Sequence, residues 1–142
     1  MRKLILGATL ALCAGATASA GTTTAPSATG LPGTTWAVNC AAPASATNFY
    51  LFYTLDADGN LTEVLRSTWN EERQVRNIQA ISSDWLLYTL TNKAGQPVNI
   101  LTFMGKDGRK KSWWSVGGDG TPYIADGRYP EAGEPPWFTR CR

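Results

Sequence analysis

Two short stretches, Thr35-Trp36-Ala37-Val38-Asn39-Cys40 and Pro136-Trp137-Phe138-Thr139-Arg140-Cys141, decide how this chain folds. Each places a Trp four residues before a Cys, one near the start of the sequence and the other near its end. A disulfide between Cys40 and Cys141 would hold the two stretches side by side. We therefore expect the first and last strands of the fold to be neighbours.

Residues 1–20 have the pattern of a secretory signal peptide. Arg2 and Lys3 form a charged start, an apolar run follows, and Ala18-Ser19-Ala20 resembles a cleavage site. The apolar run is shorter than the roughly 20 residues that a membrane helix needs. A membrane anchor is therefore the less favoured alternative, as is a lipoprotein signal ending at Cys13, where a small residue would be expected in place of Leu12.

Cleavage would change the charge and cysteine counts. Loss of Arg2 and Lys3 leaves 11 basic residues against 11 acidic residues, so the formal net charge falls from +2 to zero. That balance gives no reason to expect a nucleic-acid partner. Loss of Cys13 leaves Cys40 and Cys141, which we expect to form one disulfide in an oxidising compartment. The Ala-rich signal favours a secreted or periplasmic protein of a bacterium.

After the signal, we expect a flexible leader at 21–32 and a single domain at 33–142. The leader is rich in Thr, Ala, Ser, Gly and Pro and offers little apolar surface to offset the entropy of ordering. The domain has alternating apolar and polar residues between turn signals, which predict β-strands. The expected strands are 34–40, 48–55, 61–69, 75–82, 85–91, 98–104, 110–116, 121–125 and 137–141, with 70–74 expected to be a loop.

The sequence predicts an all-β fold of about eight antiparallel strands, because the domain has no apolar period of 3.6 over ten residues. A disulfide between the first and last strands favours a closed sheet without free edges. An up-and-down barrel is therefore the preferred architecture, and a two-sheet sandwich is the alternative.

The stretch Gly33-Thr34-Thr35-Trp36 resembles the Gly-x-Trp opening of lipocalin-like (calycin) barrels, with one extra residue in the spacing. In that family the Trp plugs the closed end and an Arg from a late strand packs over it. The resemblance implies this role for Trp36 and offers Arg128 or Arg140 as the Arg. The layout is also similar to that of small bacterial barrel inhibitors of secreted metalloproteases. Both likenesses imply a binding or inhibitory barrel.

The chain lacks the residues of several kinds of catalytic site. It contains no His, which removes the Ser-His and Cys-His nucleophilic systems and the commonest metal ligand. The acidic pairs Glu131 with Glu134 and Glu71 with Glu72 fit solvated loop charge better than acid–base catalysis. Asp56-Ala57-Asp58-Gly59-Asn60 fits a hairpin turn better than a calcium loop. We expect no catalytic residues, no metal site and no cofactor.

The candidate binding residues are aromatic, with one lysine beside them. In Arg109-Lys110-Lys111-Ser112-Trp113-Trp114, basic and aromatic side chains could hold an anionic ligand, a glycan or a lipid headgroup. Strict alternation would put Ser112 and Trp114 on one face and Lys111 and Trp113 on the other, with one Trp in the core. The candidate ligand-binding residues are Trp113, Trp85, Tyr50, Phe52 and Lys111.

These patterns favour a binding protein rather than an enzyme. The first hypothesis is a barrel that holds a small apolar or amphipathic ligand in its mouth. The alternative is an inhibitor or protein-interaction module of the bacterial envelope that acts through the leader or the loops. We expect a monomer without a transmembrane segment.

Overall fold

The computed structural model describes residues 22–142, and the expected signal peptide lies outside them. This part of the chain consists of nine β-strands and one short 3-10 helix. No helix within residues 22–142 is long and apolar enough to cross a membrane. The prediction of an all-β fold is confirmed.

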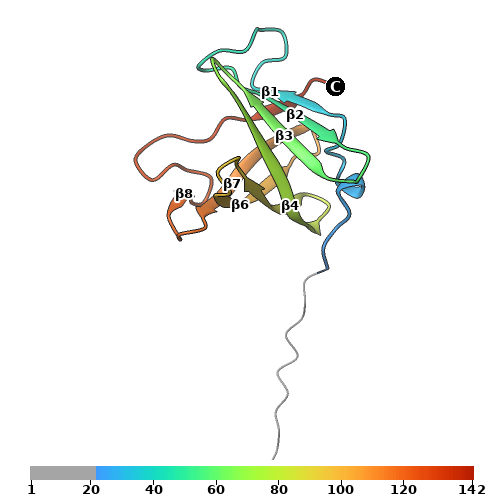
Figure 1. The fold of residues 1–142 in the computed structure, drawn as a ribbon. Helices are drawn as coiled ribbons and strands as arrows, with labels where there is room; N and C mark the ends of the chain where they lie inside the picture. The colour runs from blue at the N-terminus through green and yellow to red at the C-terminus, as the bar shows by residue number, and fades with distance from the viewer. Residues whose placement is uncertain (1–21) are drawn as a thin grey trace, which may run out of the picture.

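The strands form a closed antiparallel barrel of eight members with one extra strand (Figure 1). Around the barrel the order is β1, β2, β3, β4, β5, β6, β7 and β9, with β9 pairing back to β1, while β8 pairs with β7 alone. The bounds are β1 Thr35–Ala37, β2 Tyr50–Leu55, β3 Leu61–Arg66, β4 Asn70–Ser82, β5 Trp85–Thr91, β6 Pro97–Met104, β7 Arg109–Gly117, β8 Pro122–Ile124 and β9 Phe138–Arg140.

The two stretches that end in cysteine meet as predicted. Trp36 pairs with Arg140 across β1 and β9, and Cys40 and Cys141 form a disulfide with a Cα–Cα distance of 5.6 Å. The barrel and the disulfide are therefore confirmed, and the sandwich alternative is not the fold.

Strand β4 is longer than the sequence pattern predicts. The expected loop at 70–74 is wrong, because Asn70 to Gln74 pair residue by residue with Arg66 to Thr62 of β3. Two inward-facing members of this segment, Glu71 and Arg73, are charged, which hides the usual strand signal of an apolar face. Cross-strand pairing thus extends the strand beyond its apolar half.

Residues 22–32, the expected leader, contact the barrel. Thr24 N donates to Ile78 O at 2.6 Å, and Thr24 Oγ1 accepts from Ala80 N at 2.9 Å. These groups of β4 are available because the pairing with β5 shifts register between Arg76 and Gln79, where Asn77 has a left-handed φ of 52°. A 3-10 helix, η1 (Pro26–Thr29), follows, and Leu31 is buried in the core.

The apolar core lies inside the barrel. Leu31, Trp36 and Leu61 are buried there, and Trp36 Nε1 donates to Thr34 Oγ1 at 2.7 Å. Thr34 in turn donates from Oγ1 to the Leu31 carbonyl oxygen at 2.5 Å. These two hydrogen bonds satisfy the buried polar groups of Trp36 and Thr34.

Candidate functional site

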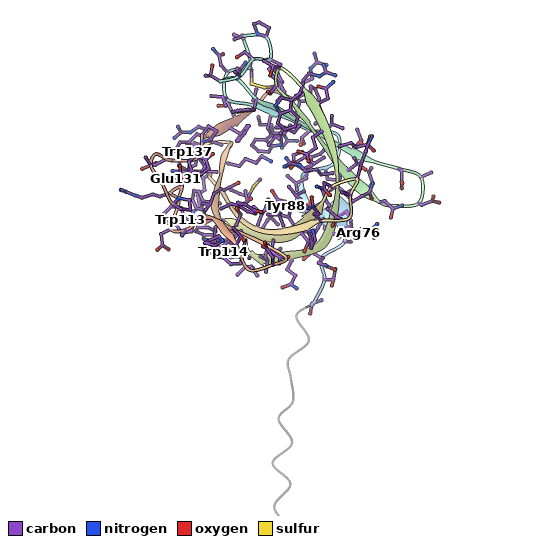
Figure 2. The ribbon with its side chains drawn as sticks, turned by 60° about the vertical axis from the view of Figure 1, so that its left-hand side comes forward. Arg76, Tyr88, Trp113, Trp114, Glu131 and Trp137 are labelled. Carbon is purple, nitrogen blue, oxygen red and sulfur yellow. A yellow bond between two sulfur atoms is a disulfide. The ribbon has the colours of Figure 1, made fainter. Side chains whose placement is uncertain are left out.

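The barrel encloses a cavity of about 370 Å³. Every barrel strand except β1 contributes to its lining, and β8 contributes as well. Figure 2 shows Tyr88 inside the ring of strands, whereas Trp113, Trp114 and Trp137 lie on its outside. The lining residues are Leu51, Glu63, Leu65, Arg73, Tyr88, Leu90, Val98, Ile100, Thr102, Lys110, Ser112, Ser115, Tyr123, Ile124 and Phe138.

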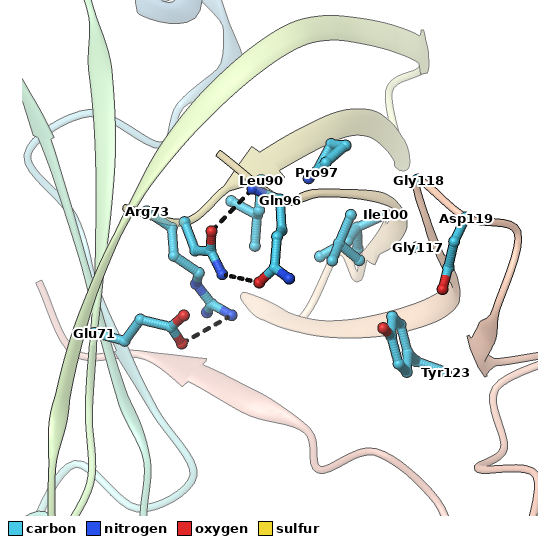
Figure 3. Close-up of a pocket in the computed structure, with 12 residues that line it drawn as sticks. Glu71, Arg73, Leu90, Gln96, Pro97, Ile100, Gly117, Gly118, Asp119 and Tyr123 are labelled. Atoms are coloured by element: carbon cyan, nitrogen blue, oxygen red, sulfur yellow. Dashed lines mark hydrogen bonds and ion pairs between the residues drawn. The ribbon is translucent and has the colours of Figure 1, made fainter. Parts of the chain in front are cut away.

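A second hollow, of about 450 Å³, lies beside the cavity (Figure 3). Arg73, Leu90, Val98, Ile100 and Tyr123 line both spaces, so the two are adjacent. The outer hollow is bordered by the turn between β5 and β6 and by the segment that links β7 to β8. We refer to this open end as the mouth of the barrel.

Small inward side chains leave the cavity open. Ser112 and Ser115 of β7 line it, and so does Thr102 of β6, at positions where a core strand usually carries Leu, Ile or Phe. The surrounding wall is largely apolar, with Leu90 and Ile100 among its members. The arrangement matches known ligand sites, which are concave, mostly apolar and supplied with a few polar groups.

Four polar side chains, Tyr53, Glu63, Arg73 and Lys110, form an interior polar cluster. Tyr53, Glu63 and Arg73 are direct cross-strand partners on β2, β3 and β4, so the barrel register places them in one row. The Glu63 carboxylate accepts hydrogen bonds from the Tyr53 hydroxyl and from Arg73 Nη2. Glu63 is only 2% exposed, and these two donors compensate its burial.

Lys110 joins this cluster from β7. Its Nζ donates to the Tyr53 hydroxyl oxygen at 2.5 Å and lies 4.2 Å from the Tyr53 ring centroid and 5.1 Å from the Trp36 ring centroid. Burial lowers the pKa of Lys110 to about 7; the Glu63 charge opposes this shift and the Arg73 charge adds to it. The amine therefore titrates near neutral pH.

Arg73 connects the cluster to the mouth. Burial opposes its charge, but Glu63 and Glu71 together raise the pKa of its guanidinium. Its Nη1 lies 3.9 Å from Glu71 Oε2 (Figure 3), and its buried Nε has no hydrogen-bond partner among the described residues. A ligand acceptor that entered the cavity could satisfy this N–H.

Tyr88 adds a second phenol to the cavity wall. Its hydroxyl lies 3.1 Å from Thr102 Oγ1. Burial, followed by the charge of Glu63, raises the pKa of Tyr88 to about 12. The site therefore combines an apolar wall, neutral hydroxyls and two basic groups against one carboxylate, which suits a small amphipathic molecule.

The sequence-predicted site residues lie on the outer wall of the barrel. Trp85, Phe103 and Lys111 face outward in one row across β5, β6 and β7. Trp85 contacts Phe103 and Trp113 with ring centroids 5.0 and 5.9 Å apart, and Phe103 lies 6.1 Å from Trp137. We call Trp85, Phe103, Trp113 and Trp137 the outer aromatic cluster. Lys111 Nζ pairs with Glu134 at 2.6 Å beside it.

Tyr50 and Phe52 lie apart from this cluster, on β2. Their rings stack with centroids 5.9 Å apart, and the Arg66 guanidinium lies 5.0 Å from the Phe52 centroid. The Tyr50 hydroxyl donates to the Ala42 carbonyl oxygen at 2.6 Å. In the described part of the chain, the cavity lining includes neither these two residues nor Trp85, Trp113 and Lys111.

A β-bulge changes the facing of residues in β7. The pairing with β6 runs from Leu101 with Trp114 to Thr102 with Ser112, so Trp113 is an extra residue. The expectation that Ser112 and Trp114 share a face is therefore wrong: Ser112 lines the cavity, and Trp114 borders a shallow outer hollow with Leu87 and Thr89. Neither Trp of the pair enters the apolar core.

The residues of the interior polar cluster were not predicted from the sequence, although the pattern around Glu63 indicates that its side chain points into the core. In Leu61-Thr62-Glu63-Val64-Leu65, alternation puts Glu63 between two leucines on the core face. The cation over Trp36 is Lys110, not Arg128 or Arg140, the candidates implied by the lipocalin-like opening. The exposed Arg140 pairs with Trp36 through the backbone.

The closed, eight-stranded antiparallel architecture is consistent with a lipocalin-like barrel. This likeness concerns the architecture of the fold. Comparisons of the chain with protein-family models, with curated proteins and with solved structures find no match.

Proposed function

We propose that this protein is a non-catalytic binding protein that holds a small apolar or amphipathic ligand inside the barrel. The observation that carries the proposal is the largely apolar cavity between the mouth and the interior polar cluster, with the outer hollow beside it. Its inner volume of about 370 Å³ falls within the range of small-molecule sites.

The ligand would lie with its polar end on the interior polar cluster. Arg73 Nε is an unused donor, and Lys110 Nζ has donors beyond the one that Tyr53 accepts. A hydroxyl, carbonyl or carboxylate oxygen complements these groups, whereas an ammonium group would meet two basic side chains. We therefore expect a ligand with an oxygen acceptor at one end and an apolar body.

Isothermal titration calorimetry with 1-nonanol, nonanoate and nonylamine tests this preference, because the three probes share one chain length. Nonanol and nonanoate should bind and raise the melting temperature, and nonylamine should bind more weakly. Ser115→Phe would fill the cavity, because Ser115 is buried and lines it. We expect this change to weaken nonanol binding about tenfold or more.

Val116→Phe is the matched control, because the same ring is added at the next residue, which is absent from the cavity lining. Its nonanol affinity should equal that of the unchanged protein. Equal affinity of the Ser115→Phe variant, or no heat and no thermal shift with any of the probes, would rule the cavity out as the binding site.

The alternative function, an inhibitor or interaction module acting through the leader or loops, has less support. A leader-based mechanism needs residues 22–32 to reach a partner, yet Thr24 is hydrogen bonded to β4 and Leu31 is in the core. Those contacts would have to break first. The cavity needs no such rearrangement to admit a ligand.

A further inference from the structure

Lys110 differs from the neighbouring lysine in the kind of partner that it has. Lys111 is also buried, but it faces outward and its Nζ forms an ion pair with Glu134 at 2.6 Å. The hydrogen-bond acceptor of Lys110 Nζ is instead the uncharged phenol of Tyr53. Lys110 lines the cavity together with Glu63 and Arg73, two other members of the interior polar cluster.

Burial favours a neutral Lys110 amine, the Arg73 charge adds to this effect, and the Glu63 charge opposes it. Tyr53 and Tyr88 are buried phenols whose pKa values are raised, so both stay protonated at neutral pH. Glu63 bears the opposite charge, but its oxygens already accept from Tyr53 and Arg73. With the pKa of Lys110 lowered by burial to about 7, a large share of the amine carries a free electron pair at neutral pH.

From this geometry we propose that Lys110 is a covalent capture site for aldehydes, forming an imine with an apolar aldehyde that enters the barrel cavity. The inference rests on the proposed function, because the aldehyde must first occupy the cavity. It narrows the ligand class to molecules with a terminal carbonyl group and an apolar body.

The reaction balances without an oxidant or a reductant. The Nζ electron pair forms a bond to the carbonyl carbon, and the carbonyl π electrons move to oxygen, which takes up a proton to give a carbinolamine. The C–O bond then breaks, the C=N bond forms, and the two protons lost by nitrogen leave with the oxygen as water. The Tyr53 hydroxyl accepts from Lys110 and donates to Glu63, so it lies where it can pass these protons.

Nonanal and sodium borohydride provide the direct test, since reduction converts an imine into a stable nonyl amine. The protein is incubated with nonanal at neutral pH, reduced, digested and mapped by mass spectrometry. We expect one nonyl group, located on Lys110, formed about tenfold or more faster than on Lys111 or on the exposed Lys93. Excess 1-nonanol, which cannot form an imine, should suppress the modification by competing for the cavity.

Two substitutions of Lys110 test whether the reaction needs the amine itself or only a positive charge at this position. Lys110→Met removes the amine and Lys110→Arg keeps a cation that cannot form an imine, so both should lose the modification. Lys111→Met is the matched control and should keep it. Since mapping of the unchanged protein locates the adduct, the inference remains testable even if a Lys110 variant fails to fold.

The outcomes distinguish this inference from the proposed function. Binding of 1-nonanol without a nonyl group on Lys110 would overturn the imine proposal and leave the binding proposal standing. Modification spread evenly over the lysines would also overturn it. Absence of both nonanol binding and the Lys110 adduct would overturn the two together.

Discussion

At the scale of single residues, the interior polar cluster decides how the barrel responds to pH. Burial places the pKa of folded Lys110 at about 7, whereas that of an unfolded lysine is about 10.4. Between these values the unfolded chain binds more protons than the folded one, so this residue makes the free energy of unfolding rise with pH. Glu63, Arg73, Tyr53 and Tyr88 are the ionisable groups that surround it.

Lys110→Met should remove that pH dependence. In urea titrations, the stability of the unchanged protein relative to the variant should rise by up to about 1.4 kcal/mol per pH unit between about pH 7.5 and pH 9.5. The raised pKa values of Tyr53 and Tyr88 keep both phenols protonated in this window. Parallel stability curves for the two proteins would contradict the lowered pKa.

Glu63→Gln tests the carboxylate at the centre of the cluster. The change leaves the Arg73 guanidinium without its buried counter-charge, so we expect a loss of about 3 kcal/mol in the free energy of unfolding. Glu72→Gln is the control, because Glu72 meets Lys93 at 3.8 Å in an exposed pair worth about 1 kcal/mol or less. Similar losses in both variants would argue against a central role for Glu63.

At the scale of elements, one register shift in β4 and one in β7 change which groups these two strands present to their surroundings. The shift in β4 exposes backbone groups of Ile78 and Ala80 to Thr24, and the extra residue Trp113 in β7 turns Trp114 outward. The shift in β4 lies at Asn77, whose φ of 52° is left-handed. A chain segment that precedes the first strand thereby packs on the barrel, with Leu31 buried in the core.

Leu31→Ala should release this segment. Removal of a buried Leu side chain is expected to cost about 2–4 kcal/mol, measured by urea unfolding. Hydrogen exchange at the Ala80 amide, which donates to Thr24, should accelerate in the variant. The exposed Thr23 offers the control Thr23→Ala, which should leave both measurements unchanged. Unchanged exchange at Ala80 in Leu31→Ala would show that Thr24 binds independently of Leu31.

The positions of the strands could be predicted from the sequence more fully than which residues of each strand point into the barrel. Alternation in Trp85–Thr91 and the turn at Asp56–Asn60 located hairpins that the structure contains. The direction in which each side chain points was harder to predict. One extra residue in a strand, such as Trp113, reverses the alternation of inward and outward side chains, and the sequence does not mark where this happens. The aromatic residues predicted to bind a ligand therefore lie on the outer wall, whereas Glu63 and Lys110, which were not predicted, line the cavity.

At the scale of the whole molecule, closure depends on the junction of β1 and β9. The disulfide between Cys40 and Cys141 spans 101 residues and fastens this junction. In the chain-entropy model, a loop of this size contributes about 4–5 kcal/mol by restricting the unfolded chain. The two similar Trp and Cys stretches therefore mark the pair of strands that closes the barrel, β1 and β9. The proposed binding site lies in the interior of the barrel.

Reduction of the disulfide should lower the melting temperature by roughly 10–20 °C. The double variant Cys40→Ser/Cys141→Ser should show the same fall without reductant, measured by circular dichroism. Thiol labelling of denatured, non-reduced protein should leave Cys40 and Cys141 unmodified. A melting temperature that reduction does not change would contradict a stabilising role for the bond.

Strand β9 also fixes when the barrel can form during synthesis. Until residues 138–140 have been made, β1 and β7 lack their partner and present open edges that can pair with other chains. Pairing of β1 with β9 joins residues that are about a hundred positions apart, a long-range contact that slows folding. The nascent chain therefore passes through an aggregation-prone stage that ends only when its last strand is in place.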